Sequence, residues 1–349
     1  MVHIMNFSKP AIKALIASTF LASSVASATE LTLPAANELS TGAPYNSFLV
    51  YSLDLLEKCA ADLRCQPQAG LPVQSSPGQI RDQAVVLTSA NGLSNFPDPF
   101  PVGSSVDNRF LTPTGNQSAT YTMAGADAGG GFAGDQVDRW DIRLDLLQSY
   151  LGNNELVFLF DNNQEGGSIN QFIFLWGQAR IVDAAGNTVN NLCFELSNNS
   201  GGCTDTGSNP MPAQTDYVAG ATDFCVDKIT GASYKIGMAA NAGDCPVEAG
   251  HPQGGYQVNN NISTATAEFA AFNQALNDAA KNAANGNLFL SLNIKYFGNN
   301  AGFEQLWICS ECNVANGPDI ITEVPEPASL PLVLLGLGFA GLTLVRRRK

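Results

Sequence analysis

The residues whose spacing most directly suggests metal chemistry lie in DNNQEG, a segment that begins at Asp161. Asp161, Asn163 and Glu165 place oxygen-bearing side chains two residues apart, as in the first half of an EF-hand calcium loop. The twelfth position of such a loop carries a bidentate glutamate, whereas this chain has Phe172 there. The segment therefore fits either a calcium site or a polar hairpin turn between apolar strands, and we expect no other cofactor.

A second group of carboxylates lies upstream, at Asp135, Asp138, Asp141 and Asp145. These aspartates are either solvated strand positions or a cation site. Glycoside hydrolysis needs only two carboxylates about 5–10 Å apart. Because the chain has 31 acidic residues, an extracellular carbohydrate-active enzyme with paired carboxylates is the alternative to a non-catalytic protein.

Nucleophilic catalysis has weaker support in the sequence. A triad would have to use His251, which lies in the turn-like segment AGHPQGGY, and the chain has no G-x-S-x-G motif. We therefore expect no catalytic residues.

Eight cysteines lie between the two chain ends, and an even number in an exported chain is typical of disulfides. If each pairs with its nearest neighbour, the bonds are Cys59–Cys65, Cys193–Cys203, Cys225–Cys245 and Cys309–Cys312. The last pair also has the C-x-x-C spacing of a redox centre or of half a zinc site. A structural disulfide is the expected state, because no βαβ pattern surrounds this pair and few other zinc ligands are present.

Three tryptophans, Trp140, Trp176 and Trp307, could stack against sugars if they were exposed on a β-sheet. Each lies in an apolar strand-like segment, so burial in the core is the favoured interpretation.

The charge distribution excludes one class of partner. Residues 29–327 contain 11 basic and 31 acidic residues, which gives a net charge of −20. Nucleic-acid binding depends on clustered lysine and arginine, so we expect no nucleic-acid partner.

The apolar pattern indicates a mainly β protein. Short apolar runs separated by Gly- and Asn-rich turns predict strands, including three expected to form a meander, and the pattern from Trp140 predicts a strand running into a helical turn. One helix is expected over 263–286, capped by Ser263 or Thr264, because Phe269, Phe272 and Leu276 recur at helical spacing. Such elements are typical of an antiparallel β-sandwich, jelly-roll-like or Ig-like, with one packed amphipathic helix. The other strands are expected at 47–56, 83–90, 155–160, 169–183, 188–196, 287–297 (half-buried) and 304–309, the last one.

The N-terminus has the pattern of a secretory signal peptide over residues 1–28. Two lysines precede a short apolar stretch, and Ala26-Ser27-Ala28 forms an A-x-A cleavage site. We expect export through the general secretion machinery, a β-rich domain over 29–312 and a linker over 313–323.

The C-terminal segment, 324–349, has the features of a membrane anchor. Residues 328–345 form an uncharged stretch of 18 residues, which is long enough for a short transmembrane helix. The basic tail at 346–349 follows, formed by Arg346, Arg347, Arg348 and Lys349, and positive charge stays on the cytoplasmic side. The body is therefore expected outside that membrane.

The triplet Pro325-Glu326-Pro327, followed by an apolar span and a terminal arginine cluster, resembles the PEP-CTERM sorting signal of Gram-negative bacteria. The resemblance covers only this tail. It implies processing by exosortase around the triplet, an inner-membrane-anchored intermediate, and then a place at the cell surface or outside the cell. We therefore predict a non-enzymatic surface or biofilm-matrix protein with a structural, adhesive or exopolysaccharide-contacting role.

Overall fold

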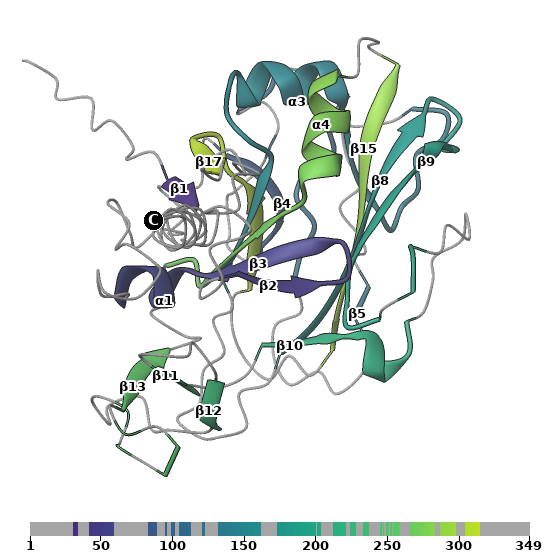
Figure 1. The fold of residues 1–349 in the computed structure, drawn as a ribbon. Helices are drawn as coiled ribbons and strands as arrows, with labels where there is room; N and C mark the ends of the chain where they lie inside the picture. Colours follow the sequence, from purple (N-terminus) through teal and green to yellow (C-terminus); the bar gives the residue numbers. More distant parts are fainter. Residues whose placement is uncertain are drawn as a thin grey trace, which may run out of the picture.

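The chain is mainly β in the computed structural model, and its strands form antiparallel sheets with few helices (Figure 1). The structure describes residues 31–33, 42–58, 83–88, 95, 99–101, 105–112, 121–122, 132–161, 173–199, 201–203, 212–220, 224–227, 233–236, 245, 247, 249–250, 252, 254–258, 266–282, 287–297 and 304–314. Two six-stranded sheets dominate these residues.

The first sheet is antiparallel throughout and consists, in spatial order, of β2 (Gly42–Tyr45), β3 (Phe48–Ser52), β14 (Phe269–Phe272), β7 (Val157–Asp161), β16 (Gln305–Ile308) and β4 (Ala84–Thr88). Every residue of β4, β7 and β16 is buried. The apolar run Val157–Phe160 is typical of a strand covered on both faces. The prediction that 155–160 contains such a strand is therefore confirmed.

The second sheet is built on a long antiparallel pair, β8 (Ile173–Asp183) and β15 (Leu288–Phe297). Strands β10 (Val218–Gly220) and β9 (Thr188–Leu196) pair along the free edge of β8, while β5 (Tyr121–Thr122) and β6 (Trp140–Arg143) pair along β15. β8 and β9 form a hairpin whose turn includes Gly186 at φ +81°. This backbone conformation favours glycine.

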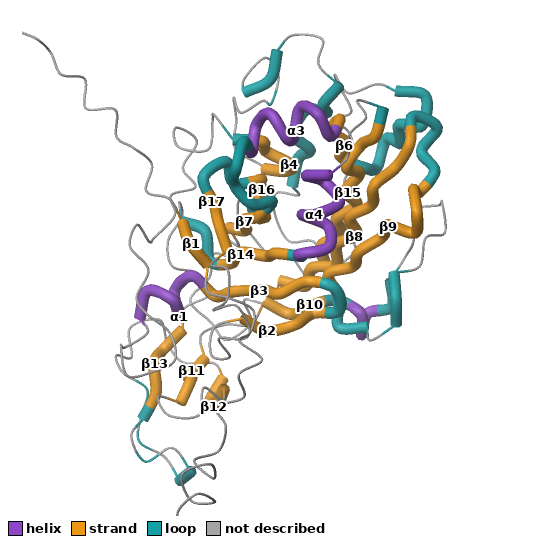
Figure 2. Tube along the Cα trace, turned by 45° about the horizontal axis from the view of Figure 1, so that its top comes forward, coloured by secondary structure: helices purple, strands orange, loops and turns teal. Residues whose placement is uncertain are grey.

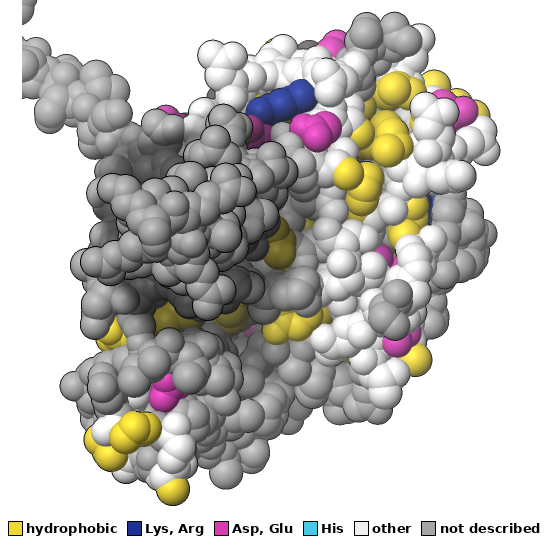
Figure 3. All heavy atoms as spheres, viewed as in Figure 1, with side chains coloured by type: hydrophobic (Ala, Val, Ile, Leu, Met, Phe, Trp, Pro, Cys, Tyr) yellow, Lys and Arg dark blue, Asp and Glu magenta, His cyan; other side chains and the backbone are white. Residues whose placement is uncertain are grey.

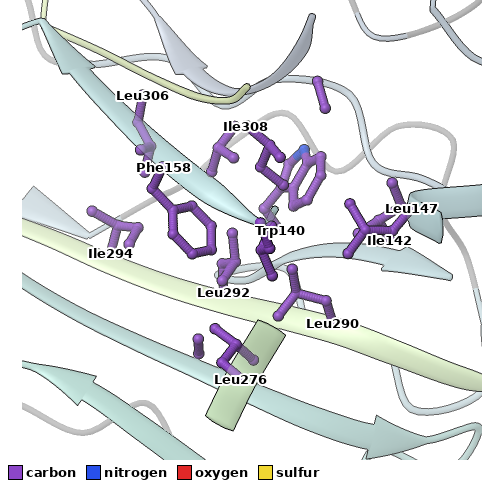
Figure 4. Close-up of a cluster of buried hydrophobic side chains, with 14 of the residues drawn as sticks. Trp140, Ile142, Leu147, Phe158, Leu276, Leu290, Leu292, Ile294, Leu306 and Ile308 are labelled. Atoms are coloured by element: carbon purple, nitrogen blue, oxygen red, sulfur yellow. The ribbon is translucent and has the colours of Figure 1, made fainter. Parts of the chain in front are cut away.

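The main hydrophobic core lies between the two sheets (Figure 4). Alternate residues of β15, including Leu290 and Leu292, point toward Phe158 of the first sheet, and Trp140 and Leu276 complete the cluster. A second core packs on the opposite face of the first sheet and includes Trp307. Burial on both faces explains why the first sheet has so few polar positions.

Smaller elements surround the two sheets. β1 (Leu31–Leu33) pairs in parallel with β17 (Cys312–Val314), and a three-stranded sheet, β12 (Ser233–Ile236), β11 (Phe224–Asp227) and β13 (Gly255–Val258), lies beside α1 (Leu53–Lys58) in Figure 2. Helices α3 (Leu144–Leu151) and α4 (Gln274–Asn282) contact one another, and a short 3-10 helix, η1, spans Gln214–Asp216. The predicted strand-to-helix transition after Trp140 is confirmed by β6 and α3.

The prediction of a helix over 263–286 is wrong in its first half. Phe269–Phe272 form β14, which pairs with β3 on one side and β7 on the other, and the helix begins only at Gln274. Backbone pairing to two neighbours overrides the helical periodicity of the side chains. Asn273 supplies the cap, because its Oδ1 accepts a hydrogen bond of 2.6 Å from the N–H of Leu276.

Three expectations about strands are also corrected. β7 belongs to the first sheet and β8 to the second, so 155–196 is not one meander, although the β8–β9 hairpin is confirmed. β15 is buried on both faces rather than on one, from Phe289 to Tyr296. β17 follows the strand expected to be the last. Sheet partners and covering segments come from distant parts of the chain, so periodicity cannot predict them.

Within the ranges that the structure describes, no helix is long and apolar enough to cross a membrane. Residues 1–28 and 324–349, which carry the predicted signal peptide and sorting signal, lie outside those ranges.

Candidate functional site

The candidate site lies on the face of the second sheet that points away from the main core. Side chains alternate along a strand, so Trp140 and Ile142 enter the core and Asp141, between them, points to the other face. The neighbouring strands place further polar side chains on that face, and all of them are buried: Gln178, Arg180, Ser291, Asn293 and Lys295.

The pairing register sets Asp141 in a row of polar residues. Ser291 on β15 lies opposite Asp141 of β6 on one side and Arg180 of β8 on the other. Directly opposed positions in a sheet bring Cβ atoms to about 5 Å, so these three side chains are immediate neighbours.

Asp107 joins Asp141 through the backbone. Val106 bridges to Ile142, so residues 105–107 run antiparallel to β6. The N–H of Asp107 donates to the carbonyl oxygen of Asp141 at 2.9 Å, and the N–H of Asp141 donates to Oδ2 of Asp107 at 2.7 Å. The two residues are held together by main-chain geometry and not by side-chain contacts alone.

The segment 132–139 brings Asp135 to the same place. The ring of Phe132 stacks on Phe289 of β15, with ring centroids 3.8 Å apart. Gly134 packs directly against the backbone of the β8–β9 turn, and a Cβ atom built there would lie 2.0 Å from the nitrogen of Gly186. Arg139 closes the segment, since its Nε donates to Oε1 of Gln136 at 2.8 Å.

Together these elements form a carboxylate cluster of Asp107, Asp135 and Asp141, with one ligand oxygen from each within 4.8 Å of the others. Asp107 and Asp141 are buried and Asp135 is partly exposed. By contrast, the acidic side chains visible on the face drawn in Figure 3 lie scattered over the surface.

Burial changes the ionisation of two groups on this face. The pKa of the Asp141 carboxyl is raised to about 7, chiefly because burial disfavours its charged form. The Ser291 hydroxyl and the Arg139 charge oppose this shift, and the charge of Asp135 adds to it. The pKa of Lys295 is lowered to about 8, again chiefly by burial.

Of the four aspartates singled out in the sequence, the structure brings Asp135 and Asp141 together. Asp145 is separate, because its carboxylate forms a paired contact with the Arg143 guanidinium at 2.5 and 3.0 Å, and that pairing lowers the pKa of Asp145. Asp138 is not one of the three clustered aspartates, but its negative charge acts on the same face of the sheet by raising the pKa of Lys295. Sequence reasoning missed Asp107, since only the bridge from Val106 to Ile142 brings it to the cluster.

The other calcium candidate is only partly described. Asp161 ends β7 and is buried, and its Oδ2 accepts a hydrogen bond of 3.2 Å from Nε2 of Gln305. Asn163 and Glu165 lie outside the described residues. Because β7 and β8 belong to different sheets, the segment between them is a connection between sheets and not the hairpin turn of the other interpretation.

The cysteines and tryptophans have structural roles. Three bonds join sequence neighbours as expected, Cys193–Cys203, Cys225–Cys245 and Cys309–Cys312, while Cys59 and Cys65 lie outside the described residues. The C-x-x-C sulfurs are thus bonded to each other. All three tryptophans are buried, with at most 2 % of their surface exposed, so they are not a sugar-stacking platform.

The fold and the chain's tail define a class: a mainly β, exported protein that passes through a membrane on its route. Residues 323–349 match the PEP-CTERM protein-sorting motif, and this match carries the assignment of export. The chain belongs to the family described as Domain of unknown function (DUF8239), whose model matches residues 31–295. No curated protein and no solved structure compared with the chain matches it.

Proposed function

We propose that the chain is an exosortase-sorted protein of the cell surface or extracellular matrix, with a structural, adhesive or polysaccharide-contacting role and without catalysis. The observation that carries this proposal is the PEP-CTERM motif at 323–349, which lies C-terminal to a disulfide-bonded β domain. Two sheets sharing one core support a β-sandwich as the exported body.

The proposed route has three steps. The signal peptide is removed after Ala28, the apolar span 328–345 holds the body at the outer side of the inner membrane, and exosortase then acts at Pro325-Glu326-Pro327. The disulfides support this route, because such bonds persist in oxidising compartments outside the cytoplasm.

The intact mass of the protein isolated from its own cells tests the sorting step. The expected mass lacks residues 1–28 and the span 328–345. A Glu326→Ala variant and a strain lacking exosortase are expected to retain the span, while Glu311→Ala, at an exposed position outside the motif, is the matched control. A wild-type mass that still includes 328–349 would contradict the proposal.

Binding of the processed protein to isolated exopolysaccharide, with and without calcium, tests the proposed role. Binding that saturates supports contact with the matrix. Absence of binding under both conditions would leave the sorting proposal intact and remove the polysaccharide contact.

The alternative is an extracellular carbohydrate-active enzyme, and one observation favours it. Asp141, with a pKa of about 7, lies beside the Asp135 carboxylate, and a glycosidase needs such a proton donor beside a second carboxylate. Asp141 is only 2 % exposed, which supports the non-catalytic role because a sugar must reach the acid. Release of reducing ends by wild type, and its loss in Asp141→Asn, would establish the enzyme instead.

A further inference from the structure

The carboxylate cluster of Asp107, Asp135 and Asp141 has the dimensions of a cation site. Calcium takes oxygen ligands at about 2.3–2.6 Å, so two of its ligands can lie up to about 5 Å apart. One oxygen from each of the three side chains lies within 4.8 Å of the others, so all three fit around one ion. Asp135 and Asp141 lie six positions apart on one continuous stretch, while Asp107 comes from the separate segment 105–112 and joins them only in the folded chain.

Asp141 provides a second and independent indication of a ligand. Asp141 is only 2 % exposed, and neither of its carboxylate oxygens has a partner at full hydrogen-bond geometry among the described residues, although the Ser291 hydroxyl lies close enough to favour the charged form. Burying a charged carboxylate without hydrogen-bond partners costs free energy of folding. Carboxylates this close to one another also repel each other. The buried Arg139 offsets part of this negative charge, and a bound cation would offset more of it.

A cation compensates the cluster more completely than a proton does. One proton neutralises only one of the three carboxylates, and the Arg139 charge supplies no ligand inside the cluster that could draw all three together. A divalent ion removes two charges and at the same time gives the oxygens of Asp141 a partner. The hydrogen bond from the Asp141 N–H holds the Asp107 side chain, and the bond from the Asp107 N–H to the Asp141 carbonyl oxygen holds the two backbones together, before the ion arrives; this lowers the ordering cost of binding.

We infer that Asp107, Asp135 and Asp141 bind one calcium ion. The three side chains offer only carboxylate oxygens, a donor set that suits hard cations such as calcium better than zinc, whose sites are built mainly from Cys and His. Calcium is preferred to magnesium because magnesium retains several waters, while two of these three aspartates are buried. The remaining ligands are water or carbonyl oxygens.

Calorimetric titration of the full chain, purified in detergent and stripped of metal with EDTA, tests this site. We expect one calcium ion per chain, weaker binding of magnesium, and a dissociation constant within the range of extracellular calcium modules, about 10⁻⁴–10⁻³ M, or tighter. At about 100 times that constant, calcium should raise the unfolding midpoint by about 5 °C.

Three substitutions locate the ion. Asp141→Asn and Asp135→Asn keep the side-chain shape and are expected to weaken calcium binding at least about 10-fold, as loss of a ligand should. Asp145→Asn is the matched control, because Asp145 lies on the same stretch of chain but pairs with Arg143 outside the cluster. Circular dichroism of each metal-free variant establishes that it folds, and Asp135→Asn serves if Asp141→Asn does not.

The possible outcomes separate clearly. Calcium uptake that is lost in both cluster variants and kept in Asp145→Asn supports the site. No uptake by wild type, or uptake unchanged in both cluster variants, would overturn it. The test does not involve the sorting signal, so its failure leaves the proposed route untouched.

Discussion

The N–H of Asp141 donates to Oδ2 of Asp107, and the N–H of Asp107 donates back to the carbonyl oxygen of Asp141, at 2.7 and 2.9 Å. The two residues are 34 positions apart in the chain. This reciprocal pair of hydrogen bonds aligns residues 105–107 antiparallel to β6. It thereby brings two buried carboxylates close together.

Asp107→Ala removes the acceptor of the buried Asp141 N–H. We expect a loss of about 1–3 kcal/mol in the free energy of unfolding, measured by urea denaturation in EDTA, because a buried donor is left without its partner. Asp107→Asn keeps a side-chain oxygen acceptor and should lose less. Equal stability of wild type and Asp107→Ala would show that this hydrogen bond is replaced.

Gly134→Ala should displace the segment that carries Asp135. The added Cβ atom would lie 2.0 Å from the backbone nitrogen of Gly186, so the segment or the β8–β9 turn has to move. We expect a loss of about 1–3 kcal/mol in stability and weaker calcium binding. Gly202→Ala is the matched control, since no atom lies within 4 Å of its added Cβ. Similar behaviour of the two variants would contradict the packing described.

Lys295→Met should change how stability depends on pH. The pKa of Lys295 is lowered from 10.5 to about 8 in the folded chain, so between these values the unfolded chain binds one more proton. Stability conferred by this group therefore rises as pH increases from about 8 to 10.5. Urea denaturation across this range should show wild type gaining stability relative to Lys295→Met. A constant difference between the two proteins would refute the shift.

Removal of disulfides should destabilise the chain according to loop length. The Cys225–Cys245 bond closes a separation of 20 residues and Cys309–Cys312 one of 3. On the loop-entropy model, replacing each pair by alanines costs about 3 kcal/mol for the first and about 2 kcal/mol for the second. The four sulfurs are all buried, so the pairs are well matched for comparison of their denaturation midpoints. The reverse order would point to a dominant local role for the C-x-x-C bond.

Trp307→Ala tests whether this aromatic residue is core or surface. Its side chain is 1 % exposed in the second core, so truncation should cost about 3–5 kcal/mol. Val137→Ala, at a position 71 % exposed, should change stability by less than about 0.5 kcal/mol. A stable Trp307→Ala variant that bound polysaccharide less well would favour a surface role instead.

Much of the strand content could be predicted from the sequence, because it depends on contiguous residues. The runs that became β4, β7 and β16 are short and apolar, and Gly- and Asn-rich segments separate several of them. The strand within 263–286 was missed because Phe269 and Phe272 fit a helical period as well as a strand, and only the partners β3 and β7 decide between the two.

The candidate site was predicted only in part. The short spacing of Asp135, Asp141 and Asp145 in the chain predicts a candidate cation site. In the structure Asp145 pairs with Arg143 instead. Nothing local distinguishes Asp107 from other isolated aspartates. Its role depends on strand pairing and on the burial of Asp141, and neither can be calculated without knowing which segments cover the sheet.

The sequence by itself determined the sorting motif at 323–349, because such a signal depends on the order of neighbouring residues: a Pro-Glu-Pro triplet, an apolar span and a basic end. Sequence adjacency also predicted four disulfides, since short separations make closure easy, and the three that fall within the described residues are confirmed. Only the tertiary structure decided which strands share a sheet and which carboxylates meet. Those relationships depend on contacts between residues far apart in the chain, where burial and backbone pairing outweigh local preference.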